Sequence, residues 1–248
     1  MTKFLHTADL HYNPRNPEPA LKSLRCLLDT VEAETPDVVV IAGDLFGVQY
    51  NNDAGFPVLH ELIQSILNRC AIIATYGTPT HDIPGCYDVF RRTQAKKSFT
   101  VFAPSATNWA IWRNSYEDKT DVLFLGLPEP QRGWFLGNTR MGRDEATTAI
   151  QAGMRSILLG MAAKRREFAE LPCVMLYHGN VAGASMCNGQ NMPPGDITIG
   201  ADDLALVDAD YYALGHIHQA QKIGDDMAFY PGSAYPVNWV ELDQQQFN

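Results

Sequence analysis

Acidic residues and histidines directly follow several apolar runs of this chain. The first case is Asp9-Leu10-His11, whose carboxylate and imidazole are two residues apart and so share one side of an extended strand end. Such a pair suits one metal ion, but a lone D-x-H pair also occurs by chance. The remaining ligands that a metal site needs stand in Gly43-Asp44, His81-Asp82, His178-Gly179 and Gly215-His216-Ile217-His218.

The number of histidines in these stretches strengthens the case for a metal site. Five of the seven histidines follow apolar, β-like runs and stand beside glycine, aspartate or another histidine. One such histidine is more often an ordinary core or loop residue, whereas five together with Asp9 and Asp44 favour a metal centre. Mixed carboxylate and imidazole ligands suit manganese, iron or zinc better than calcium.

The apolar runs predict a layered α/β fold. Val38–Ala42 and Ala71–Ala74 are apolar throughout, as expected of central parallel strands with both faces covered. Apolar residues recur at helical spacing over 21–31 and 58–66, and Phe4–Ala8 predicts the first strand. Strands alternating with helices imply right-handed crossovers. Sites in such sheets gather at the carboxyl ends of the strands, where the polar clusters stand.

The second half of the chain continues this pattern less regularly. Asp144–Ala169 predicts a long helix with a stripe of apolar residues, whereas Pro128–Gly142 and Ala182–Gly200 are rich in glycine and proline and predict loops. The further strands that we expect are 100–103, 110–112, 122–125, 174–177, 211–214, 227–230 and 237–242.

Composition narrows the class of protein. The 248 residues, 46% hydrophobic and 19% charged, suit one large globular domain or two small ones. A net charge of −9 argues against broad electrostatic binding of nucleic acid, but not against a local contact. The five scattered cysteines form no C-x-x-C pair, which favours reduced thiols. With neither a signal-peptide pattern nor a membrane-length apolar run, we expect a cytoplasmic protein without a membrane partner.

The motif order D-x-H, G-D, H-D, H-G and G-H-x-H resembles the calcineurin-like metallophosphoesterase family. Four longer strings resemble its SbcD-type branch, the nuclease subunits that process DNA double-strand breaks. They are Phe4–His11, Ala42–Phe46, Tyr212–His218 and Tyr230–Ser233. The resemblance runs over nearly the whole chain. It implies a four-layer α-β-β-α sandwich formed by one metallophosphoesterase domain over 1–248, with the capping and ATPase-docking segments of that branch absent.

The resemblance also implies a site with two divalent metal ions. Manganese is the expected ion, with magnesium, iron and zinc as alternatives. The two ions would share a hydroxide that attacks the phosphorus of a phosphodiester. Asp44 would bridge them, Asp9, His11 and His218 would complete the first ion's ligands, and His178 and His216 would hold the second.

Two further roles follow from the same resemblance. His81 would steady the phosphate and protonate the leaving oxygen as the general acid, and Asp82 would orient the His81 ring. The chain departs from the family at Thr80, where the family has an asparagine whose carbonyl binds the second ion. A threonine hydroxyl is a poorer ligand, so we expect Thr80 to hold that ion more weakly.

The resemblance favours a manganese-dependent DNA nuclease with an SbcC-like ATPase of the SMC family as partner. Arg15, in the loop after His11, is the candidate for contact with the DNA backbone. A phosphoesterase of the same fold acting on nucleotides or phosphoproteins is the close alternative, because the motifs handle only the phosphorus. A catalytically weak subunit that binds DNA ends or an ATPase is the third reading. Exonuclease or endonuclease action and a homodimer are left open.

Overall fold

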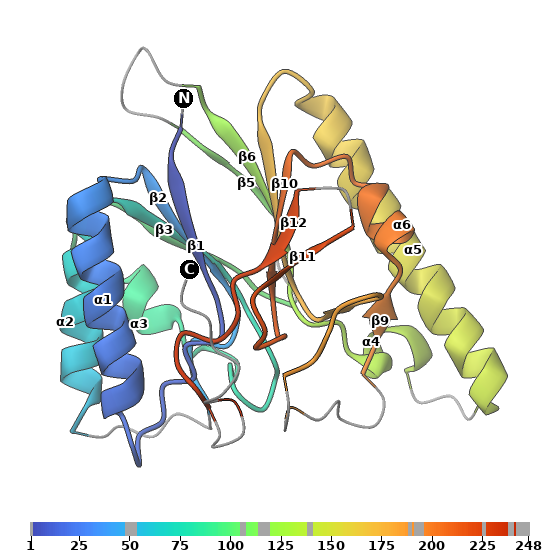
Figure 1. Cartoon of the computed structure of the whole chain (residues 1–248). Coiled ribbons are helices and arrows are strands. Elements are labelled where there is room, and N and C mark those ends of the chain that lie inside the picture. Colours follow the sequence, from blue (N-terminus) through green and yellow to red (C-terminus); the bar gives the residue numbers. More distant parts are fainter. Residues whose placement is uncertain are drawn as a thin grey trace.

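The structure, a computed structural model, describes residues 2–47, 54–104, 108–113, 120–137, 141–187, 190, 196–224, 227–237 and 241. Two β-sheets pack face to face, and helices cover the outer face of each sheet (Figure 1). The layers follow the α-β-β-α order that the sequence predicts. Among the described residues, no helix is long and apolar enough to cross a membrane.

The first sheet is entirely parallel, in the order β1-β2-β3-β4. Its strands are β1 (Phe4–Thr7), β2 (Val38–Ala42), β3 (Ala71–Thr75) and β4 (Phe99–Phe102). The connecting helices are α1 (Glu18–Glu34), α2 (Phe56–Leu67) and the short α3 (Asp88–Arg91). Because all four strands run the same way, their carboxyl ends share one edge of the sheet.

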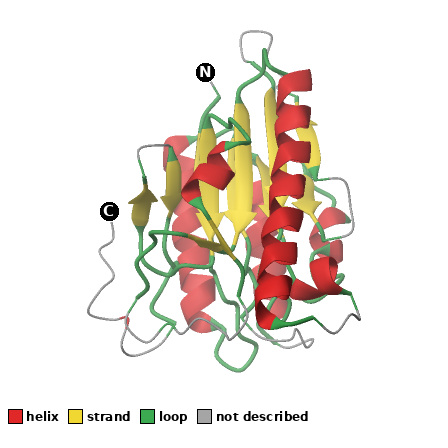
Figure 2. Cartoon of the chain, turned by 90° about the vertical axis from the view of Figure 1, so that its right-hand side faces the viewer, coloured by secondary structure: helices red, strands yellow, loops and turns green. Residues whose placement is uncertain are grey.

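The second sheet has six strands in the order β11-β12-β10-β7-β6-β5, with antiparallel edges around a parallel centre. Its strands are β5 (Trp109–Trp112), β6 (Val122–Leu127), β7 (Cys173–His178), β10 (Tyr211–Gly215), β11 (Gln221–Ile223) and β12 (Ala228–Tyr230). Figure 2 shows the long helix α5 lying across it. The other elements are α4 (Arg132–Leu136), α5 (Arg143–Glu167), α6 (Ala201–Ala205) and the small pair β8 (Asn180–Val181) and β9 (Thr198–Ile199).

Strand alternation explains why the central strands are apolar on both faces. In β2, Val39 and Ile41 pack with the helices, whereas Val38 and Val40 pack between the sheets. The second sheet alternates likewise, with Met175 facing its helix side and the residues beside it facing the first sheet. Each fully buried Val or Ile stabilises the fold by about 1.5–3 kcal/mol. This layer between the sheets sets how closely their carboxyl ends approach.

The predicted loops contain short elements that periodicity could not reveal. Helix α4 lies within 128–142, and β9 lies within 182–200. Elements of five and two residues are shorter than the windows over which a helical or alternating period can be recognised. The predicted strand at 237–242 falls mostly outside the described residues.

Candidate metal centre

The carboxyl ends of both sheets meet at a cavity of about 390 Å³. Its walls include His11, Asp44, His81, His216 and His218. The cavity therefore lies at the edge where the sequence places the polar clusters, and its lining comes from both sheets.

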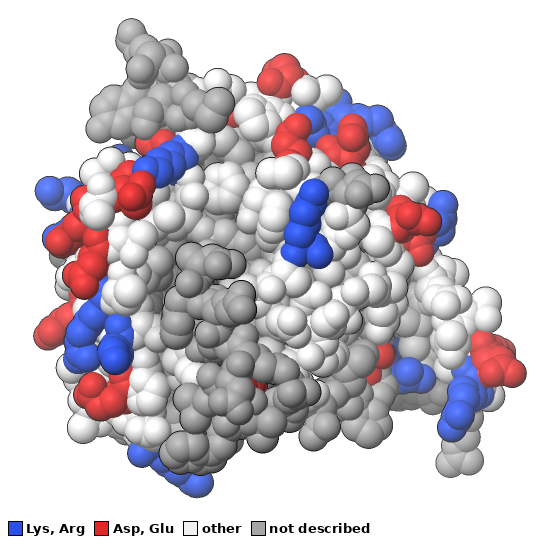
Figure 3. All heavy atoms as spheres, in the orientation of Figure 1, with Lys and Arg blue, Asp and Glu red and all other residues white. Residues whose placement is uncertain are grey.

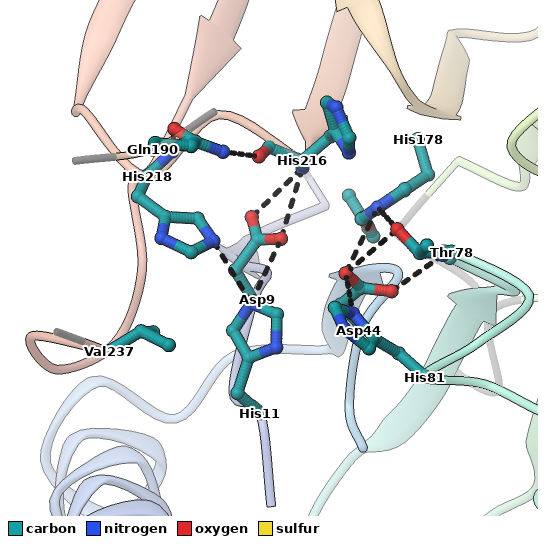
Figure 4. Close-up of polar contacts among 12 residues, drawn as sticks. Asp9, His11, Asp44, Thr78, His81, His178, Gln190, His216, His218 and Val237 are labelled. Atoms are coloured by element: carbon teal, nitrogen blue, oxygen red, sulfur yellow. Dashed lines mark hydrogen bonds and ion pairs between the residues drawn. The ribbon is translucent and has the colours of Figure 1, made fainter. Parts of the chain in front are cut away.

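The possible ligand atoms converge in overlapping groups, and Asp9 and Asp44 each belong to two of them. One group of possible ligand atoms, all within 4.8 Å of one another, comes from Asp9, His11 and His218. Asp44 forms a group with Asp9 and His178, and another with His11 and His81. Figure 4 shows His11 and His218 beside Asp9, and Thr78, His81 and His178 gathered around Asp44. A further group joins His178 and His216 to Glu129, which the sequence motifs did not indicate.

Several of these residues have a strained backbone. Asp9, His11, Asp44 and His216 have positive φ angles of 52°, 44°, 50° and 96°. Non-glycine residues seldom adopt this region, and each such case costs about 1–3 kcal/mol. The backbone N–H of Asp9 donates to Gly43 O at 3.1 Å, and that of His11 donates to Asp44 O at 2.9 Å. The fold thus stabilises strained loops at the positions that carry the converging side chains.

Hydrogen bonds between the sheets hold the two sides of the site together. The backbone N–H of His216 donates to both carboxylate oxygens of Asp9, at 3.1 and 3.0 Å. His178 Nδ1 donates to Ala42 O at 2.7 Å. Gly215 makes this approach feasible, because a Cβ at that position would overlap Ala42 O. The end of β10 therefore lies directly against the ends of β1 and β2.

Each of two imidazoles is oriented by a partner on its Nδ1. With Nδ1 of His178 on Ala42 O, its Nε2 lies 3.4 Å from Asp44 Oδ2. His218 Nδ1 lies 2.9 Å from the buried carboxylate of Glu241, so its Nε2 faces His11 Nε2 at 3.0 Å. Histidines that bind metals usually donate their other ring N–H to a carboxylate or carbonyl in this way.

Burial and the carboxylates set the charges of the imidazoles. Burial lowers the pKa of His11 to about 3, so its ring is neutral and available as a ligand. Burial also lowers the pKa of His178, but the charge and hydrogen bond of Asp44 outweigh it and raise that pKa to about 10. The buried carboxylates therefore favour a cation beside them, and a metal ion would take the place of such protons.

The residues present fit divalent metal ions. Two imidazole nitrogens face each other at 3.0 Å, and Oε2 of Glu129 and Oδ2 of Asp196 are buried without a hydrogen-bond partner. A buried acceptor without a partner costs about 1–3 kcal/mol, more when it is charged, and a bound cation removes that cost. Nitrogen and carboxylate donors suit first-row ions.

His81 lies against the shared aspartate. Its Nδ1 is 2.8 Å from Asp44 Oδ2, and its side chain is 30% exposed. Burial lowers the pKa of His81, but the hydrogen bond and charge of Asp44, with a smaller effect of Asp82, raise it above its ordinary value. The ring is therefore stabilised in the protonated form that a general acid needs.

Asp82 does not contact His81 as the resemblance implied. Its buried carboxylate accepts hydrogen bonds from the backbone N–H groups of Asp44 at 2.9 Å and Gly77 at 2.8 Å. It also accepts from Phe46 N at 3.1 Å and from the hydroxyl of Tyr87 at 2.7 Å. Burial and the charge of Asp44 raise the pKa of Asp82 to about 7. We therefore correct the expectation: Asp44 orients the His81 ring, and Asp82 fixes the loops that carry both.

Thr78, and not Thr80, extends its hydroxyl toward the ligands. Thr80 is exposed, although it lines the cavity. The hydroxyl of Thr78 lies 3.1 Å from Asp44 Oδ2 and 3.4 Å from His178 Nε2. The loop comes this close because the preceding residue is Gly77, where a Cβ would overlap the Asp44 carboxylate. The threonine nearest the ligands is therefore Thr78, two positions before the one that the resemblance indicates.

Arg15 is exposed in the loop that follows His11. Its backbone N–H donates to Asn13 Oδ1 at 2.9 Å. Asn13 and Asn16 line the cavity, whereas Arg15 is not among the lining residues. Its contact with DNA stays a prediction.

Three residues near the ligands were missed in the sequence. Glu129 joins the group of His178 and His216, and Glu241 holds His218. Gln190 donates to His216 O and accepts from the backbone N–H of His218 at 3.0 Å. None of the three stands in a motif with another ligand, and only the Pro-Glu-Pro setting of Glu129 marks an unusual position.

Comparison with known proteins agrees with this geometry. Residues 2–85 match the family model described as calcineurin-like phosphoesterase. It is 28% identical to the SbcD subunit of the nuclease SbcCD from Escherichia coli strain K12, over 99% of this chain and 63% of that protein. It is 23% identical to the DNA double-strand break repair protein Mre11 of Methanopyrus kandleri, over 98% of this chain and 51% of that protein. These similarities indicate a metal-dependent phosphoester hydrolase.

The chain spans less than two thirds of the length of either relative. Among solved structures, a 5'-nucleotidase precursor from Thermus thermophilus matches 91% of this chain and 43% of its own, with 16% identity and a TM-score of 0.43. The NAD nucleotidase of Haemophilus influenzae matches 93% of this chain and 46% of its own, with 13% identity and a TM-score of 0.44. Scores this low carry no argument about the substrate.

Proposed function

We propose that this chain is a manganese-dependent DNA nuclease of the SbcD type that hydrolyses phosphodiester bonds with two metal ions. The observation that carries the proposal is the position of Asp44, whose carboxylate belongs to one ligand group with Asp9 and His178 and to another with His11 and His81. Similarity to a nuclease subunit and to a DNA double-strand break repair protein, over 98–99% of this chain, supports DNA as the substrate.

The residues divide the work around a bound phosphodiester. When bound, a pair of divalent ions neutralises charge on the phosphate and lowers the pKa of water. Asp9, Asp44 and the four ligand histidines hold the ions in fixed positions. His81, with Nδ1 on Asp44, has Nε2 free to donate a proton to the leaving oxygen. Such acid catalysis is worth about 10²–10⁴-fold in rate.

The surface favours a local contact with DNA. On the face seen in Figure 3, basic and acidic side chains alternate around the rim, and the described part of this face carries no large basic patch. We therefore propose that Arg15 and the loop beside it contact the phosphates of DNA. Bound divalent ions would add positive charge at the site. An SbcC-like ATPase partner, a homodimer and a cytoplasmic location belong to the same proposal.

A phosphoesterase acting on a small substrate is the second candidate. The interspersed charges of Figure 3 and the net charge of −9 suit a nucleotide at least as well as a long polyanion. The ligand geometry serves either substrate, because it acts on the phosphorus alone.

Cleavage of labelled single-stranded and double-stranded DNA in manganese, beside a nitrophenyl phosphodiester, tests the proposal. We expect DNA cleavage that His81→Ala lowers by about 10²–10⁴-fold. Ester turnover without DNA cleavage would move the assignment to the second candidate. A natural chain that binds metal but turns over none of these substrates would favour a subunit that binds DNA ends or an ATPase.

A further inference from the structure

Glu129 lies just beyond the carboxyl end of a central strand of the second sheet. It follows β6 and stands between Pro128 and Pro130. The proline rings fix their own φ angles, and the residue before a proline avoids the helical region. Few backbone conformations are therefore open to Glu129. This sequence therefore restricts the backbone that carries the Glu129 side chain, outside any helix or strand.

The carboxylate of Glu129 faces the ligands of the second ion. One of its oxygens lies within 4.8 Å of ring nitrogens of both His178 and His216. Thr78, whose hydroxyl donates to Asp44 Oδ2 at 3.1 Å, lies close to this carboxylate. Its Oε2 is buried and has no hydrogen-bond partner. The side chain thus points at two imidazoles with an acceptor that nothing in the described chain satisfies.

We propose that Glu129 is a ligand of the second metal ion and replaces the asparagine that the sequence resemblance leads one to expect there. This inference rests on the two-metal site of the proposed function. The second ion then has two imidazoles, the shared Asp44 and the carboxylate of Glu129. The first ion has two imidazoles, Asp44 and Asp9. Both ions therefore have the same set of donor types.

The negative charge of Glu129 reverses the expectation that the second ion is bound weakly. A threonine in place of asparagine predicted a weaker second ion, because a hydroxyl is a poor ligand. A carboxylate binds a hard divalent cation more strongly than a neutral amide does, through its full charge. The second ion should therefore be held about as tightly as the first. Thr78 then donates its hydroxyl proton to the Asp44 carboxylate and need not bind the metal.

Asp196 offers a matched comparison at the same histidine. Its Oδ2 lies 3.5 Å from His216 Nε2 and, like Glu129 Oε2, is buried without a hydrogen-bond partner. It belongs to none of the ligand groups found among the described residues. Replacing either carboxylate by an amide removes a negative charge near His216. Only the replacement of Glu129 also removes a proposed ligand.

Manganese binding to the chelator-treated full chain tests the inference. Titration calorimetry would give the stoichiometry and the two affinities, and electron paramagnetic resonance would detect the magnetic coupling of a manganese pair. We expect two ions and a coupled signal in the natural chain. Glu129→Gln should weaken the second ion at least tenfold and abolish the coupled signal at low manganese. Asp196→Asn should weaken the second ion clearly less than Glu129→Gln does, and the exposed control Glu167→Gln should change the affinity less than threefold.

The outcomes separate this inference from the nuclease proposal. Two ions with unchanged affinity in Glu129→Gln, or equal losses in Glu129→Gln and Asp196→Asn, would overturn the role of Glu129 and leave the nuclease proposal standing. A natural chain that binds one ion would overturn both the role of Glu129 and the two-metal site. Selective loss of the second ion, in a chain that does not cleave DNA, would support Glu129 and refute the nuclease.

Discussion

The two halves of the metal centre are built differently. On the first side, His218 is oriented by the carboxylate of Glu241, whereas on the second side His178 is oriented by the backbone carbonyl of Ala42. The first side therefore depends on a replaceable side chain, and the second depends on how closely the sheets pack. A substitution can therefore change the orientation of His218, whereas the orientation of His178 is set by the backbone.

The largest effect should come from the residue that both halves share. Asp44→Asn removes the charge that the two ligand groups have in common, so we expect loss of both ions and at least about 10³-fold lower turnover. Metal content after dialysis and turnover of the nitrophenyl ester would measure this. The exposed Asp29→Asn is the control. A variant that keeps one ion at full affinity would show that Asp44 is not shared.

A smaller and one-sided effect should follow from Glu241→Gln. Loss of a carboxylate that orients a metal-binding histidine typically costs about 10–100-fold in metal affinity. Because Glu241 is bonded to His218, a ligand of the first ion, we expect that ion to weaken by about this factor and the second ion to keep its affinity. Manganese titration gives both values. Equal weakening of the two ions would remove the distinction between the halves.

The sequence predicted the residues that follow strands of known direction. Asp9, Asp44 and His178 come at the ends of apolar runs, and parallel strands bring such ends to one edge. The glycine-flanked pair His216 and His218 could be placed by the same reasoning. Local pattern was sufficient here because each ligand is set by its own strand.

The remaining features depend on contacts that no local pattern encodes. Glu129 reaches the site only because the two sheets pack at a particular distance, and Glu241 reaches His218 from a segment 23 residues away. The approach of Thr78 rather than Thr80 to the ligands depends on how the loop turns beside Asp44. The partners of Asp82 are mostly backbone N–H groups, whose positions exist only in the folded loops.

The smallest effect concerns His6 and the pH dependence of the free energy of unfolding. Burial lowers the pKa of His6 to about 3, so the folded state keeps it neutral while the unfolded state takes up a proton near pH 6.5. The stability that the folded chain gains by keeping this ring neutral is therefore lost as pH falls below 6.5. Between about pH 7 and pH 6 the natural chain should lose about 0.7 kcal/mol more than His6→Gln.

Urea unfolding in a metal chelator at the two pH values measures this difference. The chelator removes metal binding from the comparison, and the other histidines are common to both proteins. Identical pH dependence in the two proteins would show that His6 is protonated in the folded state as readily as in the unfolded one.

Anomalous diffraction from crystals grown with manganese tests the central claim most directly, because it places each ion among its ligands. We expect two peaks about 3.5–4 Å apart. One should lie among Asp9, His11 and His218, the other among Glu129, His178 and His216, and both should contact Asp44. A single peak, or two peaks that do not share Asp44, would contradict the account.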